Sequence, residues 1–162
     1  NTTAVIGSSA IVIDEQGNPG ETRSVRATAS EVRKTAYANP VIHPTALMRT
    51  TLVREVGGYR RWPNRCEDYE LWFRILARGY KIENINKPTI YYRQYRTHHR
   101  RNPLPVGFSR MIVGIRGALL LRSRPIALVA PLFFVVRSIL SPKVMASLLS
   151  PVLALDPRRQ HR

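Results

Sequence analysis

The sequence predicts an α/β domain followed by a basic helical extension, and three observations lead to this prediction. Residues 4–13 form an apolar, β-branched run that is typical of a buried strand. Residues 64–78 have the apolar spacing of a helix with one buried face. Residues 1–90 hold 13 basic and nine acidic side chains, whereas residues 91–162 hold 13 basic and one acidic. We therefore predict two parts, residues 1–98 and residues 99–162.

Composition limits the possible classes of protein. The chain has 162 residues, 44% of them hydrophobic, which is enough to bury a core. Cys66 is the single cysteine, so a disulfide framework and a cysteine-based zinc site are excluded. The formal net charge of +16 predicts an acidic partner, either nucleotide phosphates, nucleic acid or anionic lipid. No apolar run reaches the roughly 18 residues of a membrane span.

The first part of the chain alternates strand and helix signals, separated by Gly, Pro and Asn residues. In order, we expect a strand over 4–13 that residues 7–9 can interrupt, a turn over 14–20, a helix over 28–36 with Ser30 as its N-cap, a strand over 45–49 and a short helix over 51–56. The pair Asn39-Pro40 breaks the first helix, and Gly57-Gly58 ends the second.

The helix over 64–78 carries the clearest periodic signal. Its predicted buried face contains Leu71, Trp72, Ile75 and Leu76. Its predicted solvent stripe contains Glu70, Arg74 and Arg78, which are four residues apart. Gly79 suits the C-terminal cap, and we expect strands over 81–85 and 89–95, with residues 86–88 between them.

The second part is basic and rich in apolar residues. We expect a linker over 97–103, a helix over 106–122, a shorter apolar patch over 144–149 and a frayed end over 157–162. Residues 125–136 contain no charge and are bounded by arginines. Two interpretations remain open for them: an amphipathic helix on an anionic membrane surface, or a helical subdomain packed on the first part with its arginines solvated.

An acidic pair, Glu67-Asp68, opens the main helix. Carboxylates stabilise a helix N-terminus because the first-turn N–H groups lack partners and the helix dipole is positive there. From the pair alone, capping is the favoured interpretation. Asp68 also lies three and four residues before Leu71 and Trp72, which places it at the edge of any cavity that the buried face lines. A carboxylate in that place can act as a general base.

Five sequence elements occur in an order that resembles the C-terminal half of family 2 glycosyltransferases, which have the GT-A fold. They are Asn39-Pro40 followed by His43-Pro44-Thr45, Gly57-Gly58-Tyr59, the Glu67–Arg74 run "EDYELWFR", Gly79, and Pro88 followed by Tyr92-Arg93. The resemblance covers residues 1–98. It implies part of a GT-A domain, which is a Rossmann-like mixed sheet, and transfer of a sugar with inversion at its anomeric carbon.

The resemblance implies a role for each matching residue. Asp68 corresponds to the catalytic base, which takes the proton of the acceptor hydroxyl, and Glu67 would support it. His43 would lie near the acceptor and the donor sugar; packing at a strand start is the alternative. Arg74 corresponds to the family's helix arginine, and an exposed partner of Glu70 is the alternative.

Two further residues are candidate substrate contacts. Trp62 can stack on a sugar ring, although an anchor for its loop is the favoured interpretation. His98 can correspond to a histidine that approaches the donor diphosphate or metal. An alternative alignment places Tyr95 there instead and leaves His98 in a solvated basic linker, which we favour.

The nucleotide-binding half of such an enzyme should precede this sequence. No Asp-x-Asp motif occurs here, so we expect no metal ligands in this chain, and Mg²⁺ or Mn²⁺ bound mainly by the preceding half of the full-length enzyme. Because the chain begins with Asn1, we expect it to be a fragment that is inactive alone. The "Q..RW" signature of processive synthases is also absent, which favours single transfers.

The expected partners are a nucleotide-sugar donor, a glycan or lipid-linked saccharide acceptor of cell-surface polysaccharide synthesis, and an anionic membrane surface. The expected location is the cytoplasm, peripheral at the inner face of the plasma membrane. The alternative function is a basic interaction module without catalysis, for a membrane surface or for nucleic acid. The extension offers few aromatic side chains to stack on bases (Phe108, Phe133 and Phe134), which disfavours nucleic acid.

Overall fold

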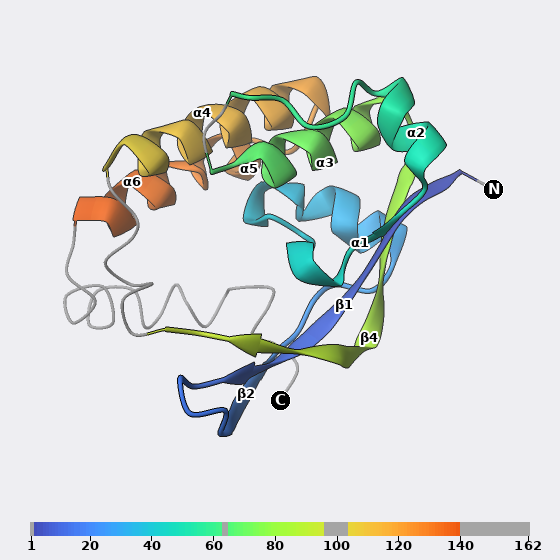
Figure 1. The fold of residues 1–162 in the computed structure, drawn as a ribbon. Coiled ribbons are helices and arrows are strands. Elements are labelled where there is room, and N and C mark those ends of the chain that lie inside the picture. Colours follow the sequence, from blue (N-terminus) through green and yellow to red (C-terminus); the bar gives the residue numbers. More distant parts are fainter. Residues whose placement is uncertain (1, 63–64, 96–103, 140–162) are drawn as a thin grey trace.

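A central strand, β1 (Thr3–Ile13), organises the sheet of the computed structural model, which describes residues 2–62, 65–95 and 104–139. Along one edge, β1 pairs in parallel with β4 (Lys81–Arg93). Along the other edge it pairs antiparallel with β2 (Pro19–Arg23) and with the two-residue β3 (Leu47–Met48). The predicted α/β class with a mixed sheet is therefore confirmed (Figure 1).

The small residues inside β1 serve close packing, and the expected interruption over residues 7–9 is wrong. β1 is continuous there, and Ser8 and Ser9 are buried. A Cβ at Gly7 would lie 2.3 Å from Oδ1 of Asn84, so glycine leaves the room that the Asn84 side chain occupies. Asn84 in turn donates from Nδ2 to the carbonyl oxygen of Arg26 at 2.6 Å.

β4 is one strand, although the sequence predicted two. Ser8 of β1 pairs with Ile85, while the next residue, Ser9, pairs with Pro88. Residues 86–87 are therefore extra residues in β4, and the irregularity accommodates a proline that cannot donate a hydrogen bond to the ladder. The pairing with β1 continues on both sides of the irregularity, which keeps β4 a single strand.

The first helix begins at a position set by local side-chain hydrogen bonds, whereas the next three helices have no side-chain capping bond. The N-cap of α1 (Ala29–Lys34) is Thr28 rather than the predicted Ser30, because Thr28 forms a reciprocal capping box with Glu31. The 3₁₀ helices η1 (Ala36–Ala38) and η2 (His43–Thr45) follow. η2 takes the first residue of the predicted strand over 45–49, since Pro44 suits a helix start, and α2 (Thr50–Glu55) lies near its predicted position.

Helix α3 (Glu67–Ala77) packs its predicted buried face into the core. Leu71, Trp72, Ile75 and Leu76 are at most 2% exposed, and the same core contains residues of α1 and β4. The predicted solvent stripe is wrong at Glu70 and Arg74, whose side chains are only 15% and 11% exposed. The reason is tertiary, because the polypeptide after α2 covers that part of α3 and supplies acceptors for the guanidinium.

Helix α4 (Leu104–Leu120) packs on α3, and α5 (Ile126–Val129) and α6 (Leu132–Ile139) follow it. Figure 1 shows α4 on the far side of α3 from the long strands. The uncharged run 125–136 is divided between α5 and α6 at Pro131, which has no N–H for a continuous helix. The predictions for 97–103, 144–149 and 157–162, and the boundary at residues 98 and 99, lie outside the described residues.

Gly117 provides a test of the contact between α4 and α3. A Cβ at this position would lie 2.2 Å from the ring of Phe73. Although alanine is the better helix former by about 1 kcal/mol, we expect Gly117→Ala to lower the free energy of unfolding by about 1–3 kcal/mol through overpacking. Urea unfolding measures this, with Ser109→Ala in the same helix as control. A Gly117→Ala protein as stable as the control would contradict the described packing.

Candidate functional site

Asp68 lies in the first turn of α3 with one carboxylate oxygen held by a distant side chain. Cys66, the N-cap residue, makes no side-chain capping bond, and three of the first four helical residues are acidic. Asn39 donates from Nδ2 to Oδ2 of Asp68 at 3.4 Å. The carboxylate is half-buried, so it remains accessible to a ligand.

Asn39 was missed as a site residue, since it was interpreted as a helix break and as part of a matching motif, with no role of its own. The residue follows η1 with a φ of 52°, in the left-handed region that Asn tolerates better than most side chains. Within the described residues, its buried Oδ1 has no hydrogen-bond partner. Asn39 therefore directs its side-chain NH2 group towards Asp68, while its side-chain carbonyl oxygen has no partner within the described residues.

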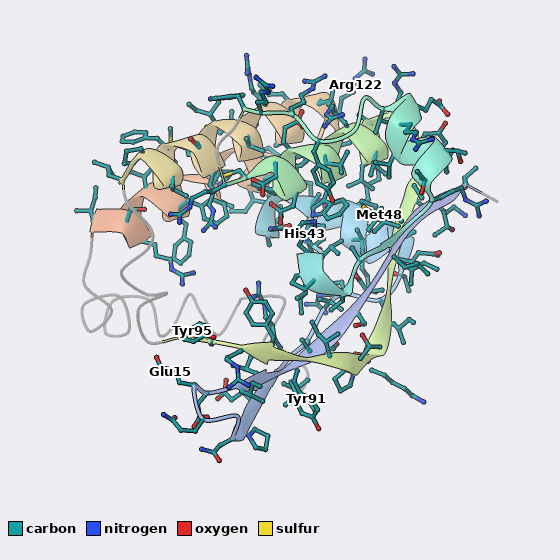
Figure 2. All side chains as sticks on the ribbon, in the orientation of Figure 1. Glu15, His43, Met48, Tyr91, Tyr95 and Arg122 are labelled. Carbon is teal, nitrogen blue, oxygen red and sulfur yellow. The ribbon has the colours of Figure 1, made fainter. Side chains whose placement is uncertain are left out.

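His43 and Tyr59 form the second component of the site. Nε2 of His43 lies 2.9 Å from the hydroxyl of Tyr59, and the two rings meet edge to face with centroids 5.8 Å apart. Trp72, which is 1% exposed, lies beneath, with its centroid 6.1 Å from that of His43. Figure 2 labels His43 and Met48 on the helical side of β1. The Tyr59 hydroxyl also donates to Sδ of Met48, at 3.6 Å.

Tyr59 connects this component electrostatically to the acidic pair. Burial raises the pKa of Tyr59 above its ordinary value of 10.0, and the carboxylates of Asp68 and Glu67 raise it further. The phenol is therefore protonated at neutral pH and can donate a hydrogen bond. Asn39, His43, Tyr59 and the pair Glu67-Asp68 thus meet from four segments of the chain.

Arg74 supports the turn that carries Tyr59. Its guanidinium donates to the carbonyl oxygens of Val56 and Gly58, the latter at 2.6 Å. It also donates to both carboxylate oxygens of Glu70, at 2.7 and 2.8 Å. The turn needs glycine because Gly57 and Gly58 have φ values of 88° and 58°. Arg74 is therefore directed at protein groups. It is the partner of Glu70, as the alternative interpretation has it, but the pair is largely buried rather than exposed.

Trp62 lies apart from the site formed by His43, Tyr59 and the acidic pair. Its ring is 51% exposed, and the guanidinium of Arg116 stacks over it at 5.8 Å from the centroid. Both residues line a groove of about 530 Å³ between α3 and α4, together with Glu70 and Phe73. Neither Asp68 nor His43 lines this groove. The structure thus brings Glu67, Asp68 and His43 together and leaves Trp62 apart, while His98 lies outside the described residues.

The thiol of Cys66, next to the acidic pair, has a raised pKa that can be tested. Burial raises the pKa of its thiol from 9.0 to about 11, against an opposing effect of the Arg110 guanidinium. At pH 8 we expect alkylation in the folded protein to be at least about 100-fold slower than in denaturant, since the thiolate is that much scarcer. The raised pKa also contributes stability that is complete below pH 9 and lost between about pH 9 and 11.

Iodoacetamide labelling followed by mass spectrometry measures this rate, and the single cysteine makes the signal unambiguous. Cys66→Ala should remove the corresponding part of the stability loss above pH 9. Equal labelling rates in folded and denatured protein would show that the thiol is not buried as described.

Within residues 2–62, 65–95 and 104–139, no three His, Cys, Asp or Glu side chains are grouped so as to hold a metal ion. None of the helices described combines the length and the hydropathy required to cross a bilayer.

The comparisons with known proteins give one significant similarity. The chain is 32% identical over 85 residues to a curated protein of Bacillus subtilis (strain 168) named "Putative glycosyltransferase EpsE". The aligned segment covers 51% of this chain and 30% of that relative. No protein-family profile matches the chain, and no solved structure matches it. The similarity supports the class of glycosyltransferases and nothing finer.

Proposed function

We propose that this chain carries the acceptor-side catalytic centre of an inverting glycosyltransferase of family 2, built on a GT-A fold. The observation that carries the proposal is the position of Asp68, half-buried in the first turn of α3, held by Asn39 and close to the Tyr59 hydroxyl. The similarity to a protein named as a glycosyltransferase supports the same class.

In the proposed reaction, Asp68 acts as general base. Its carboxylate accepts the proton of an acceptor hydroxyl while that oxygen forms a bond to the anomeric carbon of the donor sugar. The bond from this carbon to the phosphate oxygen breaks, and the nucleoside diphosphate leaves with the bonding electron pair. Attack from the opposite side of the leaving group inverts the configuration. A positioned base of this kind contributes about 10²- to 10⁴-fold to the rate.

The neighbouring residues orient the base and the substrate. Asn39 fixes one oxygen of Asp68 and leaves the other available for the acceptor. His43 is exposed and hydrogen-bonded to Tyr59, so its ring is accessible to a saccharide hydroxyl. Glu67 adds negative charge beside Asp68. We propose that the donor is a nucleotide-sugar and that the acceptor is a glycan or a lipid-linked saccharide. The proposed reaction contains no step through a metal.

The test uses the protein at its full natural length, with diphosphate sugars of uridine, guanosine and thymidine as donors and with glycan acceptors. We expect release of nucleoside diphosphate that depends on both the donor and the acceptor. NMR of the product should show the anomeric configuration opposite to that of the donor. Retention of configuration would exclude the inverting mechanism, and no turnover with any donor would contradict the proposed activity.

A further inference from the structure

Helix α4 has two covered sides. The first faces α6, where a Cβ at Gly107 would lie 2.9 Å from the carbonyl oxygen of Phe134. The second faces α3, where Gly117 lies against Phe73 and Val113 belongs to the main core. Within residues 125–136, Phe134 packs against the main core, which agrees with one of the two interpretations left open for that run, namely a helical subdomain packed on the first part of the chain.

The third side of α4 is apolar and uncovered. Leu104, Phe108, Ile112 and Leu119 are between 38% and 61% exposed. At 100° per residue, these four side chains lie within about 80° of the helix circumference, so they form one stripe. The packing of α4 on α3 and on α6 uses its other two sides, so this stripe does not serve that packing.

Helices α5 and α6 also carry exposed apolar side chains. Ile126 and Val129 of α5 are 59% and 58% exposed, and Ile139 of α6 is 66% exposed. We call the exposed apolar side chains of α4, α5 and α6 the apolar outer face. A surface of this kind on a protein indicates a partner.

The charged side chains of residues 104–139, the part of the chain that carries the apolar outer face, have a single sign. Residues 104–139 contain five arginines and no Asp, Glu or Lys. Arg116, Arg122 and Arg124 are exposed at or just after the end of α4. A second copy of this surface would bring arginines against arginines, whereas a layer of phosphates would neutralise them. The charge pattern therefore favours an anionic lipid surface over self-association.

We propose that the apolar outer face docks on the surface of a bilayer that contains anionic phospholipids. The apolar side chains enter the boundary between headgroups and acyl chains, and the guanidinium groups contact the lipid phosphates. Both interpretations of the extension then hold together, because its inner sides pack on α3 and its outer side contacts lipid. The proposal does not depend on glycosyl transfer.

Vesicle flotation of the full chain tests this proposal. We expect it to float with vesicles of phosphatidylcholine containing 30% phosphatidylglycerol, but not with phosphatidylcholine alone. A triple variant of the outer face should partition onto these vesicles at least tenfold less than the unmodified protein; its changes are Phe108→Gln, Ile112→Gln and Leu119→Gln. Arg122→Gln and Arg124→Gln should each lower partitioning about fivefold at low salt, which is the effect of about 1 kcal/mol per basic residue.

Matched controls separate this surface from general stickiness. A second triple variant, Leu47→Gln, Ile85→Gln, Tyr91→Gln, removes three apolar side chains of the sheet that are 49–73% exposed. It should float as the unmodified protein does. Lys34→Gln, Lys87→Gln removes charge elsewhere and should have a smaller effect. Circular dichroism verifies that every variant is folded.

Three results would overturn the proposal. The first is the absence of flotation with anionic vesicles. The second is equal loss of flotation in the triple variants of the outer face and of the sheet. The third is a dimer, detected by sedimentation, that the outer-face variant dissociates while the unmodified protein does not bind vesicles; a second copy would then cover this face.

Discussion

Replacement of Asp68 by asparagine is expected to reduce glycosyl transfer by about 10²- to 10⁴-fold in the full-length protein. The amide keeps the size of the side chain and can still interact with Asn39, but it cannot accept a proton from an acceptor hydroxyl at neutral pH. Donor binding should be unchanged, because the carboxylate acts on the acceptor. Initial rates of nucleoside diphosphate release and calorimetric titration of the donor measure the two effects.

Glu15→Gln, in the exposed turn after β1, is a matched control that should keep the unmodified rate. Retained transfer by the Asp68→Asn protein would refute the assignment of the base while leaving the class of enzyme open. Loss of donor binding along with transfer would indicate that Asp68 is a structural residue of the helix start.

Replacement of Arg74 by methionine is expected to lower the free energy of unfolding by about 2–4 kcal/mol. The change removes the hydrogen bonds to the carbonyl oxygens of Val56 and Gly58 and leaves the largely buried Glu70 without its main partner. Glu70 keeps only the longer contact with Arg60 at 3.3 Å. Thermal and urea unfolding measure the loss.

Arg78→Met, one turn further along the same helix, is exposed and should change stability by less than about 0.5 kcal/mol. Arg74→Lys should recover little, since an ammonium group cannot make the paired contacts of a guanidinium. Because the turn carries Tyr59, Arg74→Met should also lower the turnover number of the full-length enzyme. Equal stability of Arg74→Met and Arg78→Met would refute this role.

Several features of the fold could be predicted because they depend on neighbours in the sequence. The periodicity of Leu71, Trp72, Ile75 and Leu76 predicted both α3 and the face that it buries. The acidic first turn and the glycine pair at 57–58 follow from helix-end and turn chemistry, which act over a few residues. The mixed α/β class follows from the same local signals.

Other features depend on residues far apart in the chain, and local patterns could not reveal them. Glu70, Arg74 and Arg78 have the spacing of a solvent stripe, but the turn after α2 covers Arg74 and accepts its hydrogen bonds. β4 looks like two strands because of Pro88, whereas pairing with β1 makes it one.

The sequence by itself determined where the helices and the acidic pair lie, because capping, turns and apolar periodicity act between residues a few positions apart. Only the tertiary structure decided that Asn39 contacts Asp68, that Tyr59 contacts His43, and that Trp62 lies in a separate groove. Asn39 and Asp68 are 29 positions apart, and Tyr59 and His43 are 16 apart. Such contacts depend on which buried faces pack against each other, and the apolar periodicity of a single segment does not determine that packing.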